Sequence, residues 1–301
     1  MAVCSSALPT VSLRSHPPAR LCIPCRSTAL IVQHRPLLMG VLNVTPDSFS
    51  DGGRSLDAEA AVAHGERLAA EGADLIDVGG ESTRPGAQPV AAAEEQRRIY
   101  PVIARLAHRV RIPISVDTSK ASVAEAALDA GAALVNDVTA LRGDPRMAGV
   151  VARARAAIIL MHMRGTPQTM QRHPRYRDVV AEVGAFLGEA AERAQARGIA
   201  RERILVDPGL GFGKLLRHNL ALLRRLPELA ALGYPMVLGP SRKSFIGQVL
   251  GVDVAERLPG TLACVAQAFY SGVSLVRVHD VAAAAQLVRM LEAIDAARRQ
   301  H

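Results

Sequence analysis

Tryptophan is absent from this chain of 301 residues, and aromatic residues of all kinds make up only 3% of it. Because 49% of the residues are nonetheless hydrophobic, the core must be built from alanine and aliphatic side chains. No apolar run approaches the roughly 20 residues that a membrane-spanning helix needs. We therefore expect a soluble protein with a large aliphatic core and no contact with a membrane.

Lysine is also scarce, at positions 120, 214 and 243 only, although the formal net charge is +8. Part of that charge comes from the first 46 residues, which hold four arginines and no acidic residue. The remainder shows no dense basic run with interleaved aromatic residues, which is the pattern of a nucleic-acid-binding surface. We expect no nucleic-acid partner.

The four cysteines form neither a disulfide framework nor a complete zinc motif. Cys22 and Cys25 have the C-x-x-C spacing, but no second pair of ligands accompanies them. This use of cysteine is typical of a reducing compartment, and we expect a cytoplasmic protein.

Residues 1–35 differ from the rest of the chain. They are rich in serine, proline and arginine, and they lack acidic residues and hydrophobic periodicity. They also lack the apolar stretch of a secretory signal peptide. We expect them to lie outside the fold as an unstructured extension. A transit segment, a disordered tail and an over-extended start all remain open.

From residue 36 to residue 299, short apolar runs alternate with longer segments of helical period. Eight such units predict one α/β domain, a (βα)₈ TIM barrel. The alternative, an open doubly wound sheet, usually has a glycine-rich fingerprint after its first strand, and none follows Asn43. The expected strands are 37–43, 75–79, 114–117, 134–137, 157–162, 204–207, 236–238 and 274–279. The expected helices are 57–71, 92–109, 120–130, 145–154, 177–197, 217–230, 254–271 and 281–299.

Polar residues follow the carboxyl ends of all eight expected strands, which meet at one end of such a barrel, its mouth. One subset is cationic: Arg277 and His279 face the same side of a strand, and Arg84 lies on a Gly/Pro-rich loop. Arginine suits phosphate oxygens, and Asn43 offers a neutral oxygen suited to Mg²⁺. We predict an anion site. The alternative for Arg277 is a salt bridge to Asp280 or to a neighbouring strand.

The other subset holds carboxylates and an amide, namely Asp117, Asn136 and Asp207, together with Lys243. A buried carboxylate pairs well with the adjacent N–H and NH₂ groups of a guanine-like or pterin ring, and an amide can both donate and accept. We predict a ring-binding site. The alternative is that Asp207 and Lys243 merely pair with each other.

Two apparent motifs lack residues or spacings that their functions require. Gly209–Lys214 is not a phosphate-binding Walker A loop, because Leu215 stands where serine or threonine is required. His162 and His173 lack the spacing of a metal site, and no role is predicted for His162.

Eight blocks of the sequence stand out when taken in chain order: 39–53 (MGVLNVTPDSFSDGG), 80–86 (GESTRPG), 115–120 (SVDTSK), 136–137 (ND), 160–163 (LMHM), 207–214 (DPGLGFGK), 241–244 (SRKS) and 277–280 (RVHD). In these blocks and their order, the sequence resembles the dihydropteroate synthases over about residues 36–295. The resemblance implies a pterin-binding (βα)₈ barrel and a transferase of folate biosynthesis that is a cytoplasmic homodimer and a sulfonamide target. It would condense (7,8-dihydropterin-6-yl)methyl diphosphate with 4-aminobenzoate to give 7,8-dihydropteroate and diphosphate.

The resemblance also implies roles for individual residues. The residues that would hold the pterin are Asp117, Asn136, Asp207 and Lys243. Those that would hold diphosphate are Asn43, Thr83, Arg84, Arg277 and His279, with Asn43 also on Mg²⁺. Those that would hold 4-aminobenzoate are Thr83, Pro85, Phe212 and Ser244. The catalytic residues would be Asp117, Lys243, Asp51 and Arg84.

The chain departs from the family's pattern at Leu210, Leu215 and Pro240, all expected near the aminobenzoate side. Two rival functions stay open. One is a catalytically silent paralogue that binds pterin, and the other is a pterin methyltransferase domain that serves a corrinoid protein. The expected homodimer would use the outer helices at 254–271 and 281–299.

Overall fold

The computed structural model describes residues 20–45 and 54–298. Its centre is a parallel eight-stranded sheet with the order β8-β7-β6-β5-β4-β3-β10-β9. A parallel bridge between Val206 of β8 and Met236, the residue before β9, closes this sheet into a barrel. The strands are β3 (Leu37–Asn43), β4 (Leu75–Gly79), β5 (Ile114–Asp117), β6 (Leu134–Asp137), β7 (Ala157–Met161), β8 (Ile204–Asp207), β9 (Val237–Leu238) and β10 (Leu275–Val278). The predicted TIM barrel is confirmed, and each strand lies where the hydrophobic runs place it.

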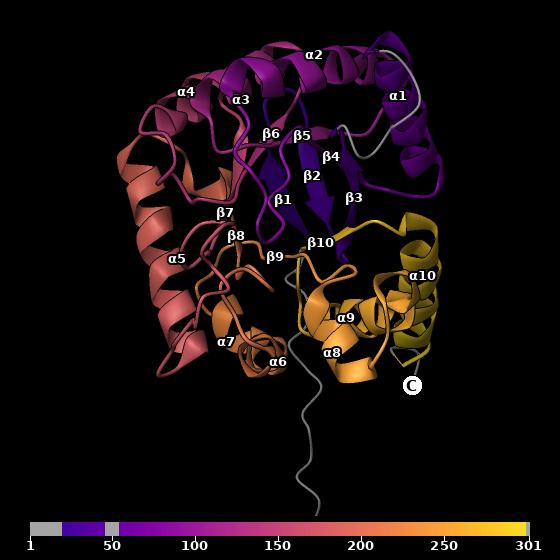
Figure 1. Cartoon of the computed structure of the whole chain (residues 1–301). Helices are drawn as coiled ribbons and strands as arrows, with labels where there is room; N and C mark the ends of the chain where they lie inside the picture. The colour runs from indigo at the N-terminus through magenta and orange to yellow at the C-terminus, as the bar shows by residue number, and fades with distance from the viewer. Residues whose placement is uncertain (1–19, 46–53, 299–301) are drawn as a thin grey trace, which may run out of the picture.

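Helices surround the barrel and connect its strands, as Figure 1 shows. Most follow a strand directly, because the apolar face of a helix must cover the outer face of the sheet, whereas α7 and α9 each come after another helix. The helices are α1 (Arg54–Ala70), α2 (Ala92–Arg109), α3 (Ala121–Asp129), α4 (Met147–Ala154), α5 (Val179–Ala196), α6 (Leu216–Arg224), α7 (Leu226–Ala230), α8 (Ser244–Leu250), α9 (Leu258–Tyr270) and α10 (Val281–Arg298).

The helices differ from the expected ones in two places. The segment expected as one helix from 217 to 230 is interrupted at Arg225, and Pro227 lies in the first turn of α7. Proline lacks the backbone N–H that a continuous helix would use there. The short helix α8 was not expected; it begins at Ser244, the last residue of the SRKS block, and is capped after Leu250 by Gly251, whose φ is 69°. Both differences are local and leave the barrel unchanged.

Residues 21–32 correct the prediction that the first 35 residues lie outside the fold. They form an antiparallel hairpin of β1 (Leu21–Pro24) and β2 (Ala29–Val32). Ile23, Leu30 and neighbouring apolar residues join the barrel's inner cluster, which includes Met39, Leu75 and Leu134. Arg203 ties the hairpin down by donating to the carbonyls of Pro24 and Cys25 at 3.1 Å each. The hairpin thus buries the apolar inner face at the end of the barrel opposite the mouth. Residues 1–19 lie outside the described part of the chain.

Within the described residues, no helix has the length and apolar character needed to cross a membrane.

Candidate functional site

The carboxyl ends of four neighbouring strands are aligned in register at the mouth. Asn43 of β3 pairs with Gly79 of β4, Gly79 pairs with Asp117 of β5, and Asp117 pairs with Asn136 of β6. Side chains at paired positions of adjacent strands point to the same face. A Cβ at Gly79 would lie 3.4 Å from Asp117 Cβ and 3.9 Å from Asn43 Oδ1. The glycine therefore leaves open the space between two predicted ligand residues.

A buried carboxylate that the sequence reasoning missed, Asp77, lies two residues before Gly79 on the same face of β4. Its Oδ2 accepts hydrogen bonds from Asn136 Nδ2 at 3.0 Å and from Arg277 Nε at 2.7 Å. Arg277 Nη2 also donates to Asp117 Oδ2 at 3.0 Å. The signal in the sequence is an aspartate inside an otherwise apolar strand, because such a group is costly to bury without a partner.

Arg277 therefore lies beside the predicted ring subset rather than apart from it. Its acceptors stand on β4 and β5, which are not adjacent to β10, so neither foreseen alternative, a salt bridge to Asp280 or to a neighbouring strand, is what forms. Both acceptors belong to the mouth. Asp280 pairs instead with Arg242, whose Nε donates to Asp280 Oδ2 at 2.9 Å.

The charge of Asp117 is sensitive to what surrounds it. Burial, reinforced by the Asp77 carboxylate and opposed by Arg277, raises the pKa of Asp117 to about 7. The carboxyl group can therefore be protonated or ionised near neutral pH. A cationic or hydrogen-bond-donating ligand would favour the ionised form, since opposite charge and donated hydrogen bonds lower an acid's pKa.

Asp207 and Lys243 stand on the other side of the mouth and do not form the simple pair foreseen as an alternative. Asp207 Oδ1 accepts from the backbone N–H of Gly209 at 2.7 Å, and none of the described residues donates to Oδ2. Lys243 Nζ donates to the Leu210 carbonyl and lies 4.7 Å from the centre of the Phe212 ring. Burial lowers the pKa of Lys243 to about 8, with Asp207 opposing the fall.

His279 is placed by Ser241 of the loop after β9. Ser241 Oγ lies 2.9 Å from His279 Nδ1 and accepts from the His279 backbone N–H at 3.1 Å. Burial, reinforced by Arg277 and Arg242, lowers the pKa of His279 to about 3. A neutral imidazole therefore faces the mouth at physiological pH.

The predicted anion-binding loop between β4 and α2 is held at its two ends. Glu81 Oε1 accepts from the Val90 N–H at 3.1 Å, and Lys120 Nζ donates to both Glu81 and the buried Glu95. Between these ends Thr83 is half-buried, whereas Arg84 and Pro85 are exposed. Asp51, the remaining predicted catalytic residue, lies outside the described part of the chain.

The predicted aminobenzoate residues come from three different loops. Phe212 packs against a cluster of Val138, Met161, Met163 and Met170, and exposed Ser244 is the first residue of α8. The β4–α2 loop reaches the loop after β7, where the Gly86 N–H donates to the Pro167 carbonyl at 3.0 Å. No residue of this fourth loop was predicted to bind aminobenzoate, because its Gly, Thr and Pro composition resembles an ordinary turn.

The side chain of Asn43 fits a metal such as Mg²⁺ that takes few protein ligands. Its amide is half-buried beside Asp117, and no described residue hydrogen-bonds it. No group of three or more His, Cys, Asp and Glu side chains among the described residues could hold an ion by itself. Mg²⁺ commonly keeps several waters and bridges one or two protein oxygens to substrate phosphates. The donor set suits that role and not a closed metal cage.

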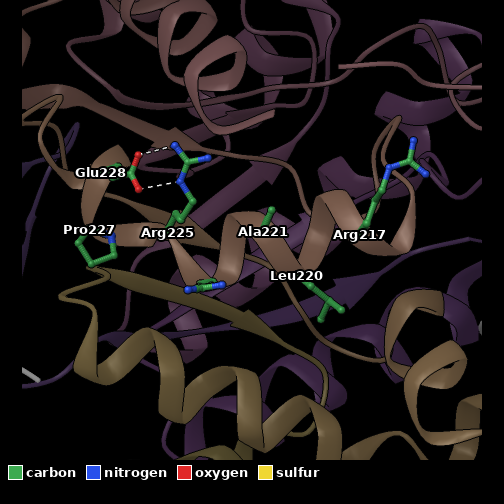
Figure 2. Close-up of a pocket in the computed structure, with 7 residues that line it drawn as sticks. Arg217, Leu220, Ala221, Arg225, Pro227 and Glu228 are labelled. Carbon is green, nitrogen blue, oxygen red and sulfur yellow. Dashed lines mark hydrogen bonds and ion pairs between the residues drawn. The ribbon is translucent and has the colours of Figure 1, made fainter. Parts of the chain in front are cut away.

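A surface hollow of about 720 Å³ lies over α6 and α7, outside the mouth (Figure 2). Within it Arg225 is paired with Glu228, with Nε to Oε1 at 2.7 Å and Nη2 to Oε2 at 2.6 Å. None of its lining residues was predicted to bind a ligand, and the hollow offers no arrangement of acids and bases comparable with the mouth. The lining residues are Arg217, Leu220, Ala221, Arg224, Arg225, Pro227 and Glu228.

Comparison with known proteins gives consistent matches. A family model described as pterin binding enzyme matches residues 39–279. The dihydropteroate synthase of Synechocystis is 45% identical over 273 residues, covering 90% of this chain and 94% of the relative. The Xanthomonas albilineans dihydropteroate synthase solved with 4-aminobenzoic acid has a TM-score of 0.87 at 48% identity, over 92% of this chain and 99% of that chain. The Yersinia pestis dihydropteroate synthase solved with a sulfonamide drug has a TM-score of 0.86 at 43% identity, over 92% of this chain and 100% of that chain.

Proposed function

The chain belongs to the dihydropteroate synthases, and from that premise we propose which of its residues carry the reaction. It is a transferase that condenses (7,8-dihydropterin-6-yl)methyl diphosphate with 4-aminobenzoate to give 7,8-dihydropteroate and diphosphate. The observation that supports the assignment of residues is the buried array of Asp77, Asp117 and Arg277, with Asp207 and Lys243 on the other side of the mouth.

Asp207, Asn136, Lys243 and Asp117 hold the pterin ring in this proposal. The free Oδ2 of Asp207 accepts from the adjacent N–H and NH₂ groups of the ring, because its Oδ1 is already used by Gly209. Asn136 is oriented by Asp77, so its amide oxygen is left to accept from the ligand. Lys243 donates to a ring nitrogen or carbonyl.

Diphosphate lies on the side of Asn43, Arg277 and His279, with Thr83 and Arg84 brought over it by the β4–α2 loop. Arg277 provides a fixed guanidinium, since two carboxylates already orient it. A guanidinium offers five donors, of which these carboxylates use only part. Mg²⁺ held at Asn43 would neutralise charge on the departing diphosphate.

The protein's own residues favour departure of diphosphate before attack by the amine. Arg277, Arg84 and His279 stabilise charge that develops on the leaving oxygens. Asp117, ionised in the presence of the ligand, stabilises the positive charge left on the pterin methyl carbon. The weakly basic amine of 4-aminobenzoate then attacks that carbon. Closure of the Thr83–Pro85 loop would exclude water, and the amine needs no strong general base.

The aminobenzoate lies between Thr83 and Pro85 on one side and Phe212 and Ser244 on the other. The buried Met cluster behind Phe212 makes a firm apolar wall for the ring. Because a relative is solved with a sulfonamide drug, we propose that sulfonamides compete for this same place. Leu210, which departs from the family's pattern, is fully buried. It therefore affects the aminobenzoate site only through its packing in the core and not by touching the ligand.

A homodimer and a cytoplasmic location complete the proposal. The outer surface near α8–α10 exposes large apolar side chains, among them Leu250 at 48% and Met290 at 61%. Exposed apolar patches commonly mark protein–protein contacts. Sedimentation of the full chain tests the dimer, and a monomer at all concentrations would refute it. Free Cys22, Cys25 and Cys264 suit a reducing compartment.

The decisive experiment is formation of dihydropteroate by the purified full chain, with and without Mg²⁺. We expect product that depends on the metal, and a loss of at least about 100-fold in kcat/KM for Asp207→Asn, because a buried ring-binding charge is removed. Binding of the pterin substrate without turnover would favour the silent paralogue. Methyl transfer to a corrinoid instead of condensation would favour the methyltransferase.

A further inference from the structure

We propose that Lys214, held by His162, is a positioning residue that fixes the Phe212 wall of the aminobenzoate site. Both residues are buried, with Lys214 only 3% exposed and His162 5%. His162 had no predicted role, and nothing in the reaction described above uses either side chain. The inference rests on the proposed place of aminobenzoate beside Phe212.

The amino group of Lys214 has three hydrogen-bond partners, which satisfy its full hydrogen-bonding capacity. Its Nζ lies 2.8 Å from His162 Nδ1 and donates to the Phe212 carbonyl at 3.0 Å and to the His162 carbonyl at 3.4 Å. Among the described residues no carboxylate forms a salt bridge with it, although Asp207 is near enough to act on its pKa. An ammonium group would donate to all three atoms, whereas a neutral amine would donate to the carbonyls and accept from Nδ1. Either form satisfies the same geometry.

Titration does not break this contact near neutral pH. Burial, reinforced by Lys214, lowers the pKa of His162 to about 2, so the imidazole is neutral. Burial likewise lowers the pKa of Lys214 well below its ordinary value. Because the three hydrogen bonds can form with either the charged or the neutral amine, Lys214 holds the loop in both protonation states. It does not act as a proton carrier.

Lys214 belongs to a loop whose carbonyl groups are held by hydrogen bonds. Every carbonyl from residue 209 to residue 213 accepts a hydrogen bond. The donors, in chain order, are the Phe212 N–H, Lys243 Nζ, Gln171 Nε2, Lys214 Nζ and the Tyr176 hydroxyl. Lys214 holds the carbonyl of Phe212 itself, while Lys243 lies over the Phe212 ring at 4.7 Å. We therefore expect loss of the Lys214 hydrogen bond to displace Phe212 more than any other part of the site.

The pterin side should be affected less, because other groups hold it. Asp207 is fixed by the Gly209 N–H at 2.7 Å, and Asn136 is fixed by Asp77 at 3.0 Å. A positioning role for Lys214 therefore predicts a change in the KM for one substrate and not the other.

The test compares Lys214→Met with Tyr176→Phe, which removes a different hydrogen bond from the same loop. For Lys214→Met we expect the KM for 4-aminobenzoate to rise about tenfold, because a buried carbonyl loses its donor. We expect kcat and the KM for the pterin substrate to change little. For Tyr176→Phe we expect a lower melting temperature without that split. A folded Lys214→Met with wild-type KM values, or the same split in both variants, would overturn the proposal.

A second pair keeps the test valid if Lys214→Met folds poorly. His162→Asn keeps an acceptor near the position of Nδ1, and His162→Leu removes it. We expect the Asn variant to retain the wild-type KM for 4-aminobenzoate and the Leu variant to lose it. Equal behaviour of the two would refute the role of His162. Wild-type protein without any dihydropteroate formation would instead refute the proposed function, so the two failures can be told apart.

Discussion

The two loops proposed to enclose 4-aminobenzoate are built in opposite ways. In the β8–α6 loop (residues 208–215) every carbonyl from 209 to 213 accepts a hydrogen bond. In the β4–α2 loop (residues 80–91) the ends are fixed by Glu81 on the Val90 N–H and by Lys120, and in the middle the Gly86 N–H donates to the Pro167 carbonyl. The difference indicates one fixed wall that defines the substrate's place and one adjustable wall that can close over it.

Glycine positions express the same contrast. A Cβ at Gly209 would lie 2.0 Å from the His162 carbonyl oxygen, and the residue has a φ of +65°. At Gly86 the φ is also positive, +82°, but nothing lies within 4 Å of the position a Cβ would take. Gly209 is therefore constrained by both backbone conformation and close packing, whereas Gly86 is constrained by conformation and by its hydrogen bond to the Pro167 carbonyl, but not by packing.

The largest expected effect comes from Gly209→Ala, which breaks the fixed wall. The added methyl group cannot avoid the backbone of His162, so the loop or the end of β7 must shift. We expect the free energy of unfolding to fall by about 3 kcal/mol or more, and kcat/KM to fall at least about 100-fold because Asp207 and Phe212 are displaced together. Urea denaturation and steady-state kinetics measure the two quantities. Wild-type activity in this variant would show that the loop is not fixed as described.

The pH dependence sharpens the comparison, because the fixed wall contacts the amino group of Lys243, whereas the charged residues of the adjustable loop are Arg84 and Glu81, and Glu81 is paired with Lys120. Lys243 must be charged to donate all its bonds, and burial lowers its pKa to about 8. We therefore expect kcat/KM to fall about tenfold per pH unit above that value. Asp117 must be ionised, and its pKa is raised to about 7, so kcat/KM for the pterin substrate should fall below that value.

Single-turnover rates at saturating substrate separate binding from chemistry in this profile. Bound ligand holds Asp117 ionised, so the acidic limb should move to lower pH or vanish once the site is filled. A sharp limb near neutral pH that persists at saturation would contradict the proposal that the amine needs no strong base. Melting temperatures across the same pH range provide the control for unfolding.

A smaller effect is expected from Glu81→Ala, which loosens the ends of the adjustable loop. The Val90 N–H loses its acceptor and Lys120 loses one of two carboxylate partners. We expect a fall in kcat/KM of roughly fivefold, equivalent to about 1 kcal/mol. The matched control is Glu59→Ala, which removes exposed ion pairs with Arg105 and Arg109 on outer helices. Equal losses in both variants would mean that Glu81 acts only on stability.

The sequence predicted the parts of the molecule that depend on periodicity and on strand ends. Eight apolar runs located the strands, and Asn43, Asp117 and Asn136 do stand in one row because parallel strands end at one edge. The hairpin at 21–32 was missed because its runs are short and its purpose, covering the apolar end of a barrel, exists only once the barrel is closed.

Side-chain contacts between different strands and loops of the barrel could not be predicted from the sequence either. Asp77 was missed because its partners, Asn136 and Arg277, are distant in sequence. His162 had no predicted role because its partner, Lys214, lies on the next loop and is recognisable only from the distance between them. Sequence pattern thus located the positions that face the mouth, whereas the links between those positions required the three-dimensional structure.

The smallest expected effect, Gly86→Ala, completes the comparison with Gly209→Ala. Both glycines have positive φ. An alanine at either position must adopt a left-handed backbone conformation, which lowers the free energy of unfolding by about 1 kcal/mol. Only Gly209 adds a collision, since no atom lies within 4 Å of the new methyl group at Gly86. We expect Gly86→Ala to leave kcat/KM within about threefold of wild type, because an adjustable loop can absorb a strain of this size. Steady-state kinetics of the two variants side by side measure this. A loss in Gly86→Ala as large as in Gly209→Ala would mean that both walls are fixed, and that closure over the substrate depends on some other segment.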